Sequence, residues 1–457
     1  MTGEGPHGLR AGIVSSIHAL ILHASRRRPL FTRERRPYRL AGHHLCSHAM
    51  VDHTACDEGR EAPDEQVPTR QVRPLQTISR PYQPGDEVEI NRLYRSITGR
   101  DRSAGEFAWE WLDTWAGQGS MNLVFDLDRE EGDQLIAQYS LIPTPLSVWG
   151  RSTVAGKTEN CMSHPDHRGS GLYFSHEREC FEKEKKNYSF FFTTAGNVAG
   201  GTVGRLRMKL GYVAFDDWAN YTLWLQTSAL REDLDSIPAK GGSGKKLAPA
   251  LSGLLATVLQ TYSRLRRRRT CGYRVAVHGT ADAPLEEIAS LWERNREHYG
   301  ISVDRSVGYL QWRVSDDPHV QHEYLTMHGD GGLLGSAITF VQGDTLHVVD
   351  VLVEAAHPEL FRNLLSALIG RGRDLGLTRI KCLVLRRSVL LPRRLRSAGF
   401  VDTSALSSGA VLRKPPPRQF FVYIPEELRG DPAVTGNADW YITALVLEGL
   451  PRPTLPP

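Results

Sequence analysis

The sequence has few cysteines and no long apolar run. Its six cysteines lie far apart, at positions 46, 56, 161, 180, 271 and 382, and no two of them are spaced as C-x-x-C. This scatter gives no indication of a structural zinc site or of a disulfide framework, so we expect no metal site. No apolar run reaches the ~18 residues that a membrane-spanning helix needs. We therefore expect a cytoplasmic protein without a transmembrane segment.

An excess of charge of one sign is also missing. The chain of 457 residues has 56 basic and 52 acidic residues, a net charge of +4. This balance argues against a nucleic-acid partner for the chain as a whole. Hydrophobic residues make up 40% and charged residues 24%, which is typical of globular proteins, and the length predicts two to three domains.

Residues 1–75 differ from the rest of the chain. They contain no lysine but eleven arginines and seven histidines, and they show no apolar periodicity. We expect a disordered Arg/His-rich extension. An arginine-rich arm that touches an anionic surface, or a start codon placed too early, are the alternatives.

From Gln76 the sequence alternates predicted strands and helices. Helices are expected after Asp86, where an apolar stripe stops at Gly99, and after Ser103. The predicted strands are Thr77–Arg80, Met121–Leu127, Gln134–Pro143, Ser147–Trp149, Thr153–Met162, Tyr188–Thr193, Val213–Phe215 and Thr222–Leu225. Two further helices, Leu172–Lys186 and Val203–Lys209, lie between the later strands. This order predicts an α/β fold built on a mixed sheet.

A glycine-rich turn joins a predicted strand to a helix in the stretch His164-Pro165-Asp166-His167-Arg168-Gly169-Ser170-Gly171-Leu172. At a helix N-terminus the first N–H groups have no partner within the helix, and the helix dipole adds partial positive charge. Gly169 and Gly171 lack the Cβ atoms that would block a phosphate oxygen, and Arg168 adds a positive charge. These features predict a phosphate or pyrophosphate site. The spacing matches neither a Walker A loop nor a G-x-G-x-x-G turn.

This stretch resembles the acyl-CoA loop of the GNAT N-acetyltransferase superfamily, written Q/R-x-x-G-x-G/A. Arg168 and Gly171 fill the first two defined positions, whereas Tyr173 stands at the third, where the family has Gly or Ala. The element order from Thr77 to Leu225 is similar to that of a GNAT domain, and Gly211-Tyr212 is similar to its closing Leu-Gly-Tyr/Phe.

The resemblance implies that acetyl-CoA, or another acyl-CoA, is the co-substrate. Its pyrophosphate would lie on Arg168, Gly169, Ser170, Gly171 and Leu172. Its pantetheine would run beside Glu159–Met162, which includes Cys161 and Met162, and Asn197 would bond the pantetheine or cap the helix that follows it. A backbone N–H of that strand would polarise the thioester carbonyl, and an amine would attack directly, without an acyl-enzyme.

The general base and the general acid stay open. Glu159 lies on the right strand and could act through water, but alternation along the strand could equally point it to solvent. His164 is the other candidate base, or a plain loop residue. At the position where many GNAT enzymes have an acidic tyrosine, this chain has Arg207, so the acid is absent or comes from elsewhere.

A linker and a second GNAT-like half follow. Residues 228–272 contain a helix, Leu247–Leu265, that ends in four arginines, Arg266 to Arg269. This helix is either an interdomain helix or a weak contact with an anionic membrane surface. From Tyr273 the element order begins again, but the loop Glu354-Ala355-Ala356-His357-Pro358-Glu359 has no Arg-Gly-x-Gly, and Glu359 would repel a pyrophosphate.

We therefore expect two tandem GNAT-like domains, of which the second is degenerate. The expected boundaries are 1–75 for the extension, 76–227 for the domain with the acyl-CoA loop, 228–272 for the linker, 273–425 for the degenerate domain and 426–457 for a tail. Tyr309-Leu310-Gln311-Trp312-Arg313 and Asp439-Trp440-Tyr441-Ile442-Thr443 resemble the tandem GNAT proteins encoded with bacterial polysaccharide-biosynthesis genes.

Three functions fit these residues. The first is an acyl-CoA-dependent N-acyltransferase that acts on a small-molecule amine, for example an amino sugar or a glycan precursor. The second is an inactive GNAT-fold binding or scaffold protein, which the substitutions Tyr173 and Arg207 favour. The third is an aminoacyltransferase with another donor, for which the arginine-rich segments would be suitable. The retained loop from Arg168 to Gly171 favours the first function.

Overall fold

The computed structural model describes residues 76–169, 171–194, 201–235, 272–357, 359–404 and 419–447. The predictions for residues 1–75, for the helix 247–265 with its four arginines, and for Ser170 and Asn197 lie outside these ranges. We call residues 76–235 the N-terminal half and residues 272–447 the C-terminal half. Within the described ranges, no helix is long and apolar enough to cross a membrane.

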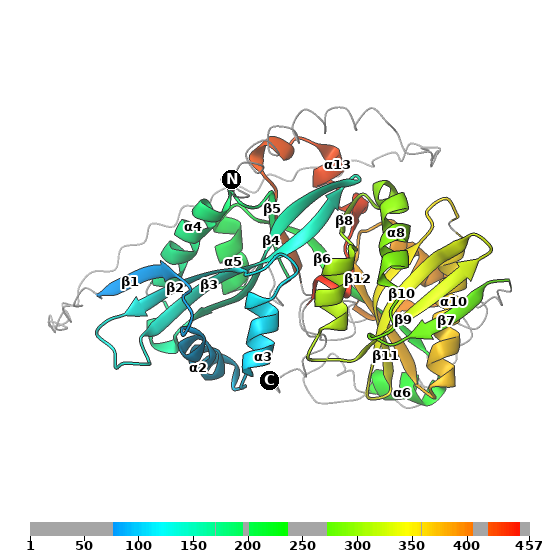
Figure 1. Ribbon diagram of the computed structural model, residues 1–457, viewed down its shortest axis with the longest axis horizontal. Coiled ribbons are helices and arrows are strands. Elements are labelled where there is room, and N and C mark those ends of the chain that lie inside the picture. The colour runs from blue at the N-terminus through cyan, green and yellow to red at the C-terminus, as the bar shows by residue number, and fades with distance from the viewer. Residues whose placement is uncertain are drawn as a thin grey trace, which may run out of the picture.

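The two halves share one sheet, which runs through the whole molecule (Figure 1). The fifteen strands of the described residues follow the order β1-β2-β3-β4-β5-β14-β6-β12-β11-β10-β9-β7, with β8, β13 and β15 paired to its sides. A single cluster of buried apolar side chains extends from Ile90 to Leu447 and so includes both halves. The two halves therefore share one sheet and one hydrophobic core.

The N-terminal half contains six strands and five α-helices among the described residues. Its strands are β1 (Thr77–Pro81), β2 (Ser120–Asp126), β3 (Leu135–Val148), β4 (Arg151–Ser163), β5 (Phe190–Thr193) and β6 (Val213–Trp224). Its main helices are α2 (Glu87–Thr98), α3 (Ala104–Phe107) continued by the π-helical turn η1 (Ala108–Leu112), α4 (Leu172–Glu184) and α5 (Thr202–Lys209), while α6 (Thr227–Asp235) ends the half. Gly99 ends α2 in a left-handed conformation, and a capping box of Ser103 and Glu106 begins α3.

The C-terminal half repeats this order. Its strands are β7 (Arg274–His278), β8 (Ile301–Val303), β9 (His322–Gly329), β10 (Gly332–Gln342), β11 (Thr345–Val353), β12 (Arg379–Leu385), β13 (Val401–Asp402), β14 (Gln419–Tyr423) and β15 (Trp440–Tyr441). Its helical segments are α8 (Leu285–Asn295), η3 (Arg296–Tyr299), α9 (Val307–Leu310), η4 (Gln311–Ser315), α10 (Leu360–Asp374), α11 (Leu390–Ser397), η5 (Glu426–Leu428), α13 (Pro432–Thr435), η6 (Asn437–Asp439) and η7 (Ala444–Val446).

Each half contributes a strand to the other. Strand β14, from the C-terminal half, lies between β5 and β6, with Val422 opposite Phe192 on one side and Val213 on the other. Strand β6, from the N-terminal half, continues past β14 and pairs with β12 over Trp218 to Trp224. The exchange explains why one sheet crosses both halves.

Strand β3 joins what the sequence suggests as two strands. Pro143 and Pro145 lie inside it, although proline normally interrupts a central strand. The carbonyl of Pro143 accepts the indole N–H of Trp115 (2.7 Å), and that of Pro145 accepts the N–H of Asp304 (2.9 Å). At both prolines, the side of the backbone that lacks an N–H group therefore faces away from β4, toward the space between β2 and β8. The hydrogen bonds between β3 and β4 are not affected.

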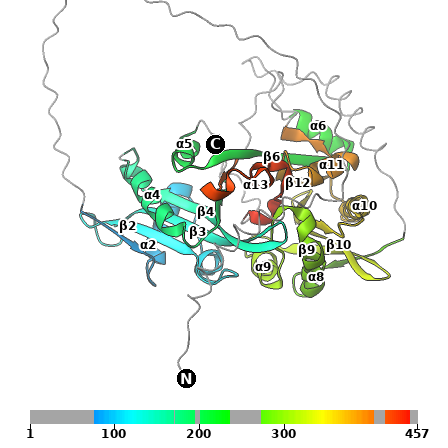
Figure 2. The ribbon, with the colours of Figure 1, turned by 90° about the horizontal axis from the view of Figure 1, so that it is seen from above.

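A repeated motif marks the contact between the halves. Asp-Arg-Ser-x-Gly-x-x-x-Trp occurs at residues 101–109 and again at residues 304–312. It places Trp109 and Trp312 in the two π-helical turns, stacked with ring centroids 5.6 Å apart. The indole N–H of each donates to the backbone carbonyl of the other (2.7 and 2.8 Å). Figure 2 shows α9 beside the N-terminal half from above.

Candidate functional site

Strands β4 and β5 separate in the middle of the N-terminal half. Their parallel pairing covers only Ala155–Lys157 of β4, opposite Phe190–Phe192 of β5, and β5 ends at Thr193. In the described part of the chain, residues 158–163 of β4 pair with β3 alone. The β3–β4 register shifts at this point, and Asn160 adopts a positive φ of 44°, which identifies a β-bulge. Among the described strands, β5 therefore pairs with only the first part of this edge of β4.

The N-terminus of α4 faces this region from beyond the end of β4. Gly169 and Gly171 have φ of 83° and 81°, and a Cβ atom at either would meet no other atom within 4 Å. The glycines are required by backbone conformation, not by crowding. Gly171 begins α4 without a side-chain cap, and no acidic residue lies in the first turn. The exposed Arg168 adds positive charge to this helix end, so it is suited to an anion.

A polar cluster covers the α4–α5 face of the bulge. Tyr173, from the first turn of α4, lies beside Cys161 and Arg207, and both act on its pKa. Arg207, from α5, also forms a buried ion pair with Glu177 of α4. On the same face Thr158 lies 3.3 Å from the Tyr212 hydroxyl. Sequence reasoning identifies Cys161 here but gives no role to Glu177.

Burial and charge fix the protonation states in this cluster. Burial raises the pKa of Tyr173 well above its ordinary value, so the phenol keeps its proton. Burial acts to lower the pKa of Arg207, but Tyr173 and Cys161 outweigh it and the pKa stays raised. The guanidinium therefore remains charged.

The opposite face of β4 carries a separate network of charges. The Lys157 ammonium is buried and lies 2.9 Å from a carboxylate oxygen of Glu159. Glu110, from η1, accepts hydrogen bonds from Arg102 (2.8 Å) and from the side-chain amide of Asn160 at the bulge (2.7 Å). Burial lowers the pKa of Lys157, and Glu159 opposes that shift. Glu159 thus lies beside the bulge. The sequence does not predict its neighbour Lys157 or the nearby pair of Glu110 and Arg102.

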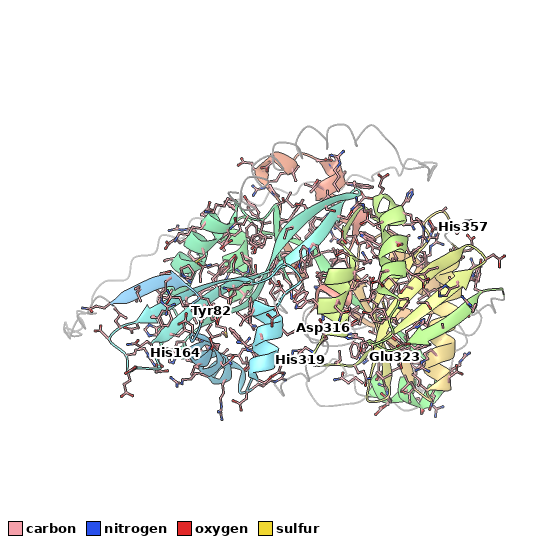
Figure 3. All side chains as sticks on the ribbon, viewed as in Figure 1. Tyr82, His164, Asp316, His319, Glu323 and His357 are labelled. Atoms are coloured by element: carbon pink, nitrogen blue, oxygen red, sulfur yellow. The ribbon has the colours of Figure 1, made fainter. Side chains whose placement is uncertain are left out.

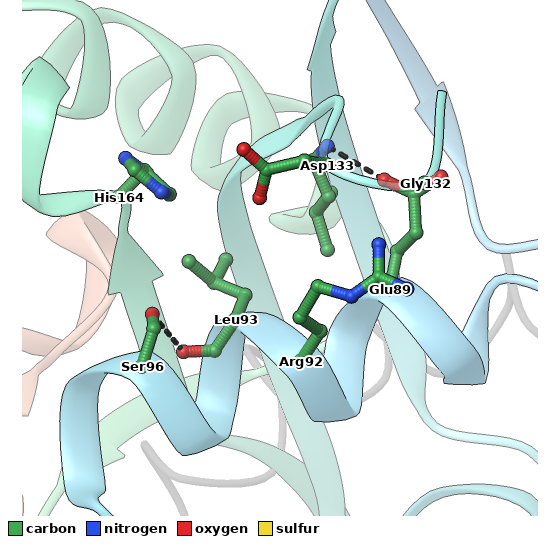
Figure 4. A pocket seen from close by; sticks show the side chains of 8 residues that line it. Glu89, Arg92, Leu93, Ser96, Gly132, Asp133 and His164 are labelled. Atoms are coloured by element: carbon green, nitrogen blue, oxygen red, sulfur yellow. Dashed lines mark hydrogen bonds between the residues drawn. The ribbon is translucent and has the colours of Figure 1, made fainter. Parts of the chain in front are cut away.

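His164 lies in a different place from Glu159. It lines a pocket of about 20 Å³, the room of a single water, between α2 and the turn before β3 (Figure 4). Its ring lies 3.3 Å from the guanidinium of Arg129, which also pairs with Asp133. Burial, followed by the charge of Arg129, lowers the pKa of His164. The structure therefore does not bring the two candidate bases together.

The remaining predicted positions are distributed around the bulge. Met162 is buried in the main core, and Leu172 packs on a small cluster of Val124, Ile136 and Ala137, which anchors the start of α4. No group of three or more His, Cys, Asp or Glu side chains within the described ranges could hold a metal ion.

The corresponding opening of the C-terminal half is filled by its own chain. Strand β11 pairs with β12 only as far as Val348, and the C-terminal segment, residues 440–447, enters beyond that point. Thr443 pairs with Val384 of β12 and donates to Asp350 of β11 (2.7 Å). Asp350 also binds Arg305 through two hydrogen bonds (2.8 and 2.9 Å).

The loop after β11 also differs from the loop after β4. Glu354 pairs with Arg294 (3.1 Å), and Glu359, just before α10, lies 3.3 Å from the ring of His357. His164 and His357, in the two loops, lie toward opposite ends of the long axis (Figure 3). Carboxylates thus stand where the N-terminal half has Arg168 and two glycines.

Comparisons with known proteins give structural likeness only. No protein-family model and no curated protein matches the chain. A conserved protein of unknown function from Enterococcus faecalis V583, a probable N-acyltransferase, has a similar structure, with TM-score 0.50, 12% identity, and coverage of 77% of this chain and 74% of that one. GCN5-related N-acetyltransferases from Anabaena variabilis (TM-score 0.47, 8% identity, 76% and 73% covered) and Kribbella flavida (0.44, 13%, 76% and 71%) are less similar.

The first of these likenesses confirms the fold class expected from the sequence. The chain has a mixed α/β fold, and the likeness extends over both halves because it covers 77% of the chain.

Proposed function

We propose that the chain is an acyl-CoA-dependent N-acyltransferase whose donor site lies in the N-terminal half. The observation that carries the proposal is the pairing of two features. Strands β4 and β5 separate beside a bulge, and the glycine-rich N-terminus of α4 faces the same region. In the C-terminal half residues 440–447 occupy the equivalent place.

In this proposal the donor is held by backbone groups. The pyrophosphate of acyl-CoA binds the N–H groups from Arg168 to Leu172, with Ser170 among them, and the side chain of Arg168 adds charge. The pantetheine takes the edge of β4 that β5 leaves, with Asn197 as a further polar partner. A backbone N–H near Cys161 and Met162 polarises the thioester carbonyl, and its effect is large because the dipole is already in place.

The acceptor is a small-molecule amine that must lose its proton before it attacks. Glu159 is our preferred base, because it lies beside the bulge and its side chain is 26% exposed, which leaves access for a bridging water. His164 is the second candidate, although its pocket lies beyond the end of β4. Glu159→Gln should therefore lower the rate of transfer more than His164→Gln does.

The proposed acceptor class, an amino sugar or glycan precursor in the cytoplasm, rests on resemblance alone. The two motifs that carry the resemblance have structural roles in this chain. Trp312 stacks on Trp109, and Trp440 and Tyr441 are buried in the tail. An amine screen that includes amino sugars, with acetyl-CoA as donor and free thiol as the readout, addresses this class directly.

Acetyl-CoA binding with a pair of glycine variants tests the donor site. Gly171→Glu places a carboxylate at the proposed pyrophosphate site and should lower affinity at least ~100-fold, because like charge repels at short range. Gly376→Glu is the matched control, since Gly376 also has a positive φ of 68° and open space around it, but follows α10 in the C-terminal half. Equal affinity of both variants would show that the donor binds elsewhere.

A further inference from the structure

Asn160 stands at the bulge of β4 in a conformation that few residues adopt. Within the described ranges, Trp149 and Asn160 are the two non-glycine residues with a positive φ, and the φ of Asn160 is 44°. Such a conformation costs free energy and persists only where neighbouring groups hold it, although asparagine adopts it at less cost than most residues. The backbone at Asn160 sets the direction of the next N–H group, which belongs to Cys161. A group that holds Asn160 therefore also directs that N–H.

Glu110 holds the side chain of Asn160 from a neighbouring element, the turn η1. Glu110 is 1% exposed, and one of its carboxylate oxygens accepts a hydrogen bond from the side-chain amide of Asn160 (2.7 Å). The other oxygen accepts from the guanidinium of Arg102 (2.8 Å). A carboxylate can only accept hydrogen bonds, so the amide nitrogen of Asn160 must face Glu110. The bulge is thus bonded to a carboxylate whose charge Arg102 balances.

Arg102 is itself held from several sides, which keeps Glu110 in place. Its side chain is 4% exposed, and its Nε donates to the side-chain carbonyl of Asn91 on α2 (2.9 Å). Its guanidinium lies over the rings of Tyr94 and Phe107, with 4.7 and 4.9 Å from its central carbon to the ring centroids. These contacts join α2, α3 and η1 into one support for the bulge.

The turn that carries Glu110 is anchored on the C-terminal half. Trp109 precedes Glu110 in η1 and exchanges indole hydrogen bonds with Trp312. In the second copy of the repeat, the residue after Trp312 is Arg313, which donates to the carbonyl of Leu445 in the tail (3.1 Å). The residue after the repeated tryptophan therefore reaches the bulge in one half and the tail in the other.

We propose that Glu110 is a positioning residue that holds the bulge of β4 in the shape that acyl transfer requires, with Arg102 as the residue that keeps Glu110 in place. This inference rests on the function proposed above, in which an N–H group near Cys161 polarises the thioester carbonyl. Glu110 does not touch the donor; it acts through Asn160. A fixed dipole contributes to the reaction only when its direction is set beforehand, which is why the bulge needs such a support.

The test changes Asn160 and follows the carbonyl of bound acetyl-CoA. Glu110→Gln would leave the buried guanidinium of Arg102 without its carboxylate and can unfold the chain. Asn160→Gly instead removes only the side chain that Glu110 holds, and glycine adopts a positive φ without strain. With acetyl-CoA that is isotope-labelled at the carbonyl, infrared difference spectra report the carbonyl stretch, which moves to lower wavenumber as the carbonyl is polarised.

We expect the wild type to move the carbonyl stretch of bound acetyl-CoA below its value in solution, and Asn160→Gly to lose at least about half of that shift. The affinity should stay within about tenfold, because the pyrophosphate site at the start of α4 is unchanged. Asn187→Gly is the matched control. Asn187 also donates its side-chain amide to a carboxylate, that of Glu184 (2.9 Å), but at an exposed position after α4, so this variant should keep the full shift.

The outcomes separate this role from the proposed function. A full shift in Asn160→Gly would refute the role of Glu110 while the donor site stands. An equal loss of shift in Asn187→Gly would also refute it, and so would a wild type that binds acetyl-CoA without any shift. A fall in affinity beyond about tenfold in Asn160→Gly would contradict a positioning role, because Asn160 would then bind the donor itself. A wild type that binds no acetyl-CoA would overturn the proposed function and this inference with it.

Discussion

The two halves of the molecule share one architecture but use its central opening differently. In the N-terminal half β4 and β5 part beside a bulge, and a glycine-rich helix end faces the gap. In the C-terminal half the tail enters between β11 and β12, and its residues 440–446 are all at least 97% buried. In our proposal, the same opening is a ligand site in the N-terminal half and a packing site in the C-terminal half, where the chain itself supplies the occupant.

The largest expected effect comes from the tail. Trp440 is 1% exposed, packs on Phe215 with centroids 4.9 Å apart, and donates to the carbonyl of Val434 (2.9 Å). Trp440→Ala should lower the free energy of unfolding by about 3–5 kcal/mol, because it creates a cavity in the shared core. Denaturant unfolding measures this loss, and a cost below about 1 kcal/mol would contradict a packing role for the tail.

Acid should reveal a second difference between the halves. The two described histidines whose pKa falls to about 4, His322 and His347, both lie in the C-terminal half, and burial is the main cause for each. A lowered histidine pKa means that the unfolded chain binds the proton first, so stability is lost as pH falls below about 6.5 toward 4. Each group should cost up to about 2 kcal/mol between pH 7 and pH 5.

His322→Phe tests this pH dependence. His322 is 2% exposed, and its ring contacts the ring of Phe340, with centroids 5.6 Å apart. We therefore expect the ring of a phenylalanine at position 322 to fit the same space. The variant should lose about 1–2 kcal/mol less than the wild type between pH 7 and pH 5. An unchanged difference between the two pH values would mean that His322 does not carry the acid sensitivity.

From the reciprocal contact between Trp109 and Trp312, we expect substitution of either residue to lower the stability equally. Trp109→Phe and Trp312→Phe each remove one indole N–H from a reciprocal pair and should each cost about 1 kcal/mol. Because the rings touch, the double variant should cost less than the sum of the two. Unequal single costs or strict additivity would show that the two tryptophans do not act as a pair.

The smallest effect is expected from residues 1–75. A chain that begins at Gln76 should unfold within about 0.5 kcal/mol of the full chain and bind acetyl-CoA with the same affinity, since the segment has no apolar periodicity with which to dock. Aggregation of the shortened chain, or weaker binding, would contradict this prediction.

The sequence predicts what depends on neighbouring residues. The α2 stripe ends at Gly99 as expected, and the glycines of the loop have the positive φ that their type suggests. The exchange of β6 and β14 depends on pairings between strands some two hundred residues apart, which no local pattern specifies. For the same reason, no local pattern predicts where the tail packs.

One part of the site can be recognised in the sequence from a repeated motif, although no single residue indicates it. The repeat that includes Arg102 and Arg305 is present in the sequence. Arg102 reaches the bulge of β4 through Glu110, and Arg305 binds Asp350, where the register between β10 and β11 also shifts. Comparing the chain with itself would have found it. Glu177 had no such signal, because its ion pair with Arg207 joins two helices whose packing depends on the fold.

The number of acetyl-CoA molecules bound per chain tests the comparison between the halves most directly. Isothermal titration calorimetry on the full chain should give one site, and Gly171→Glu should remove it. Two sites, one of which survives in Gly171→Glu, would contradict the account, because the C-terminal half would then hold a donor where the structure places residues 440–447.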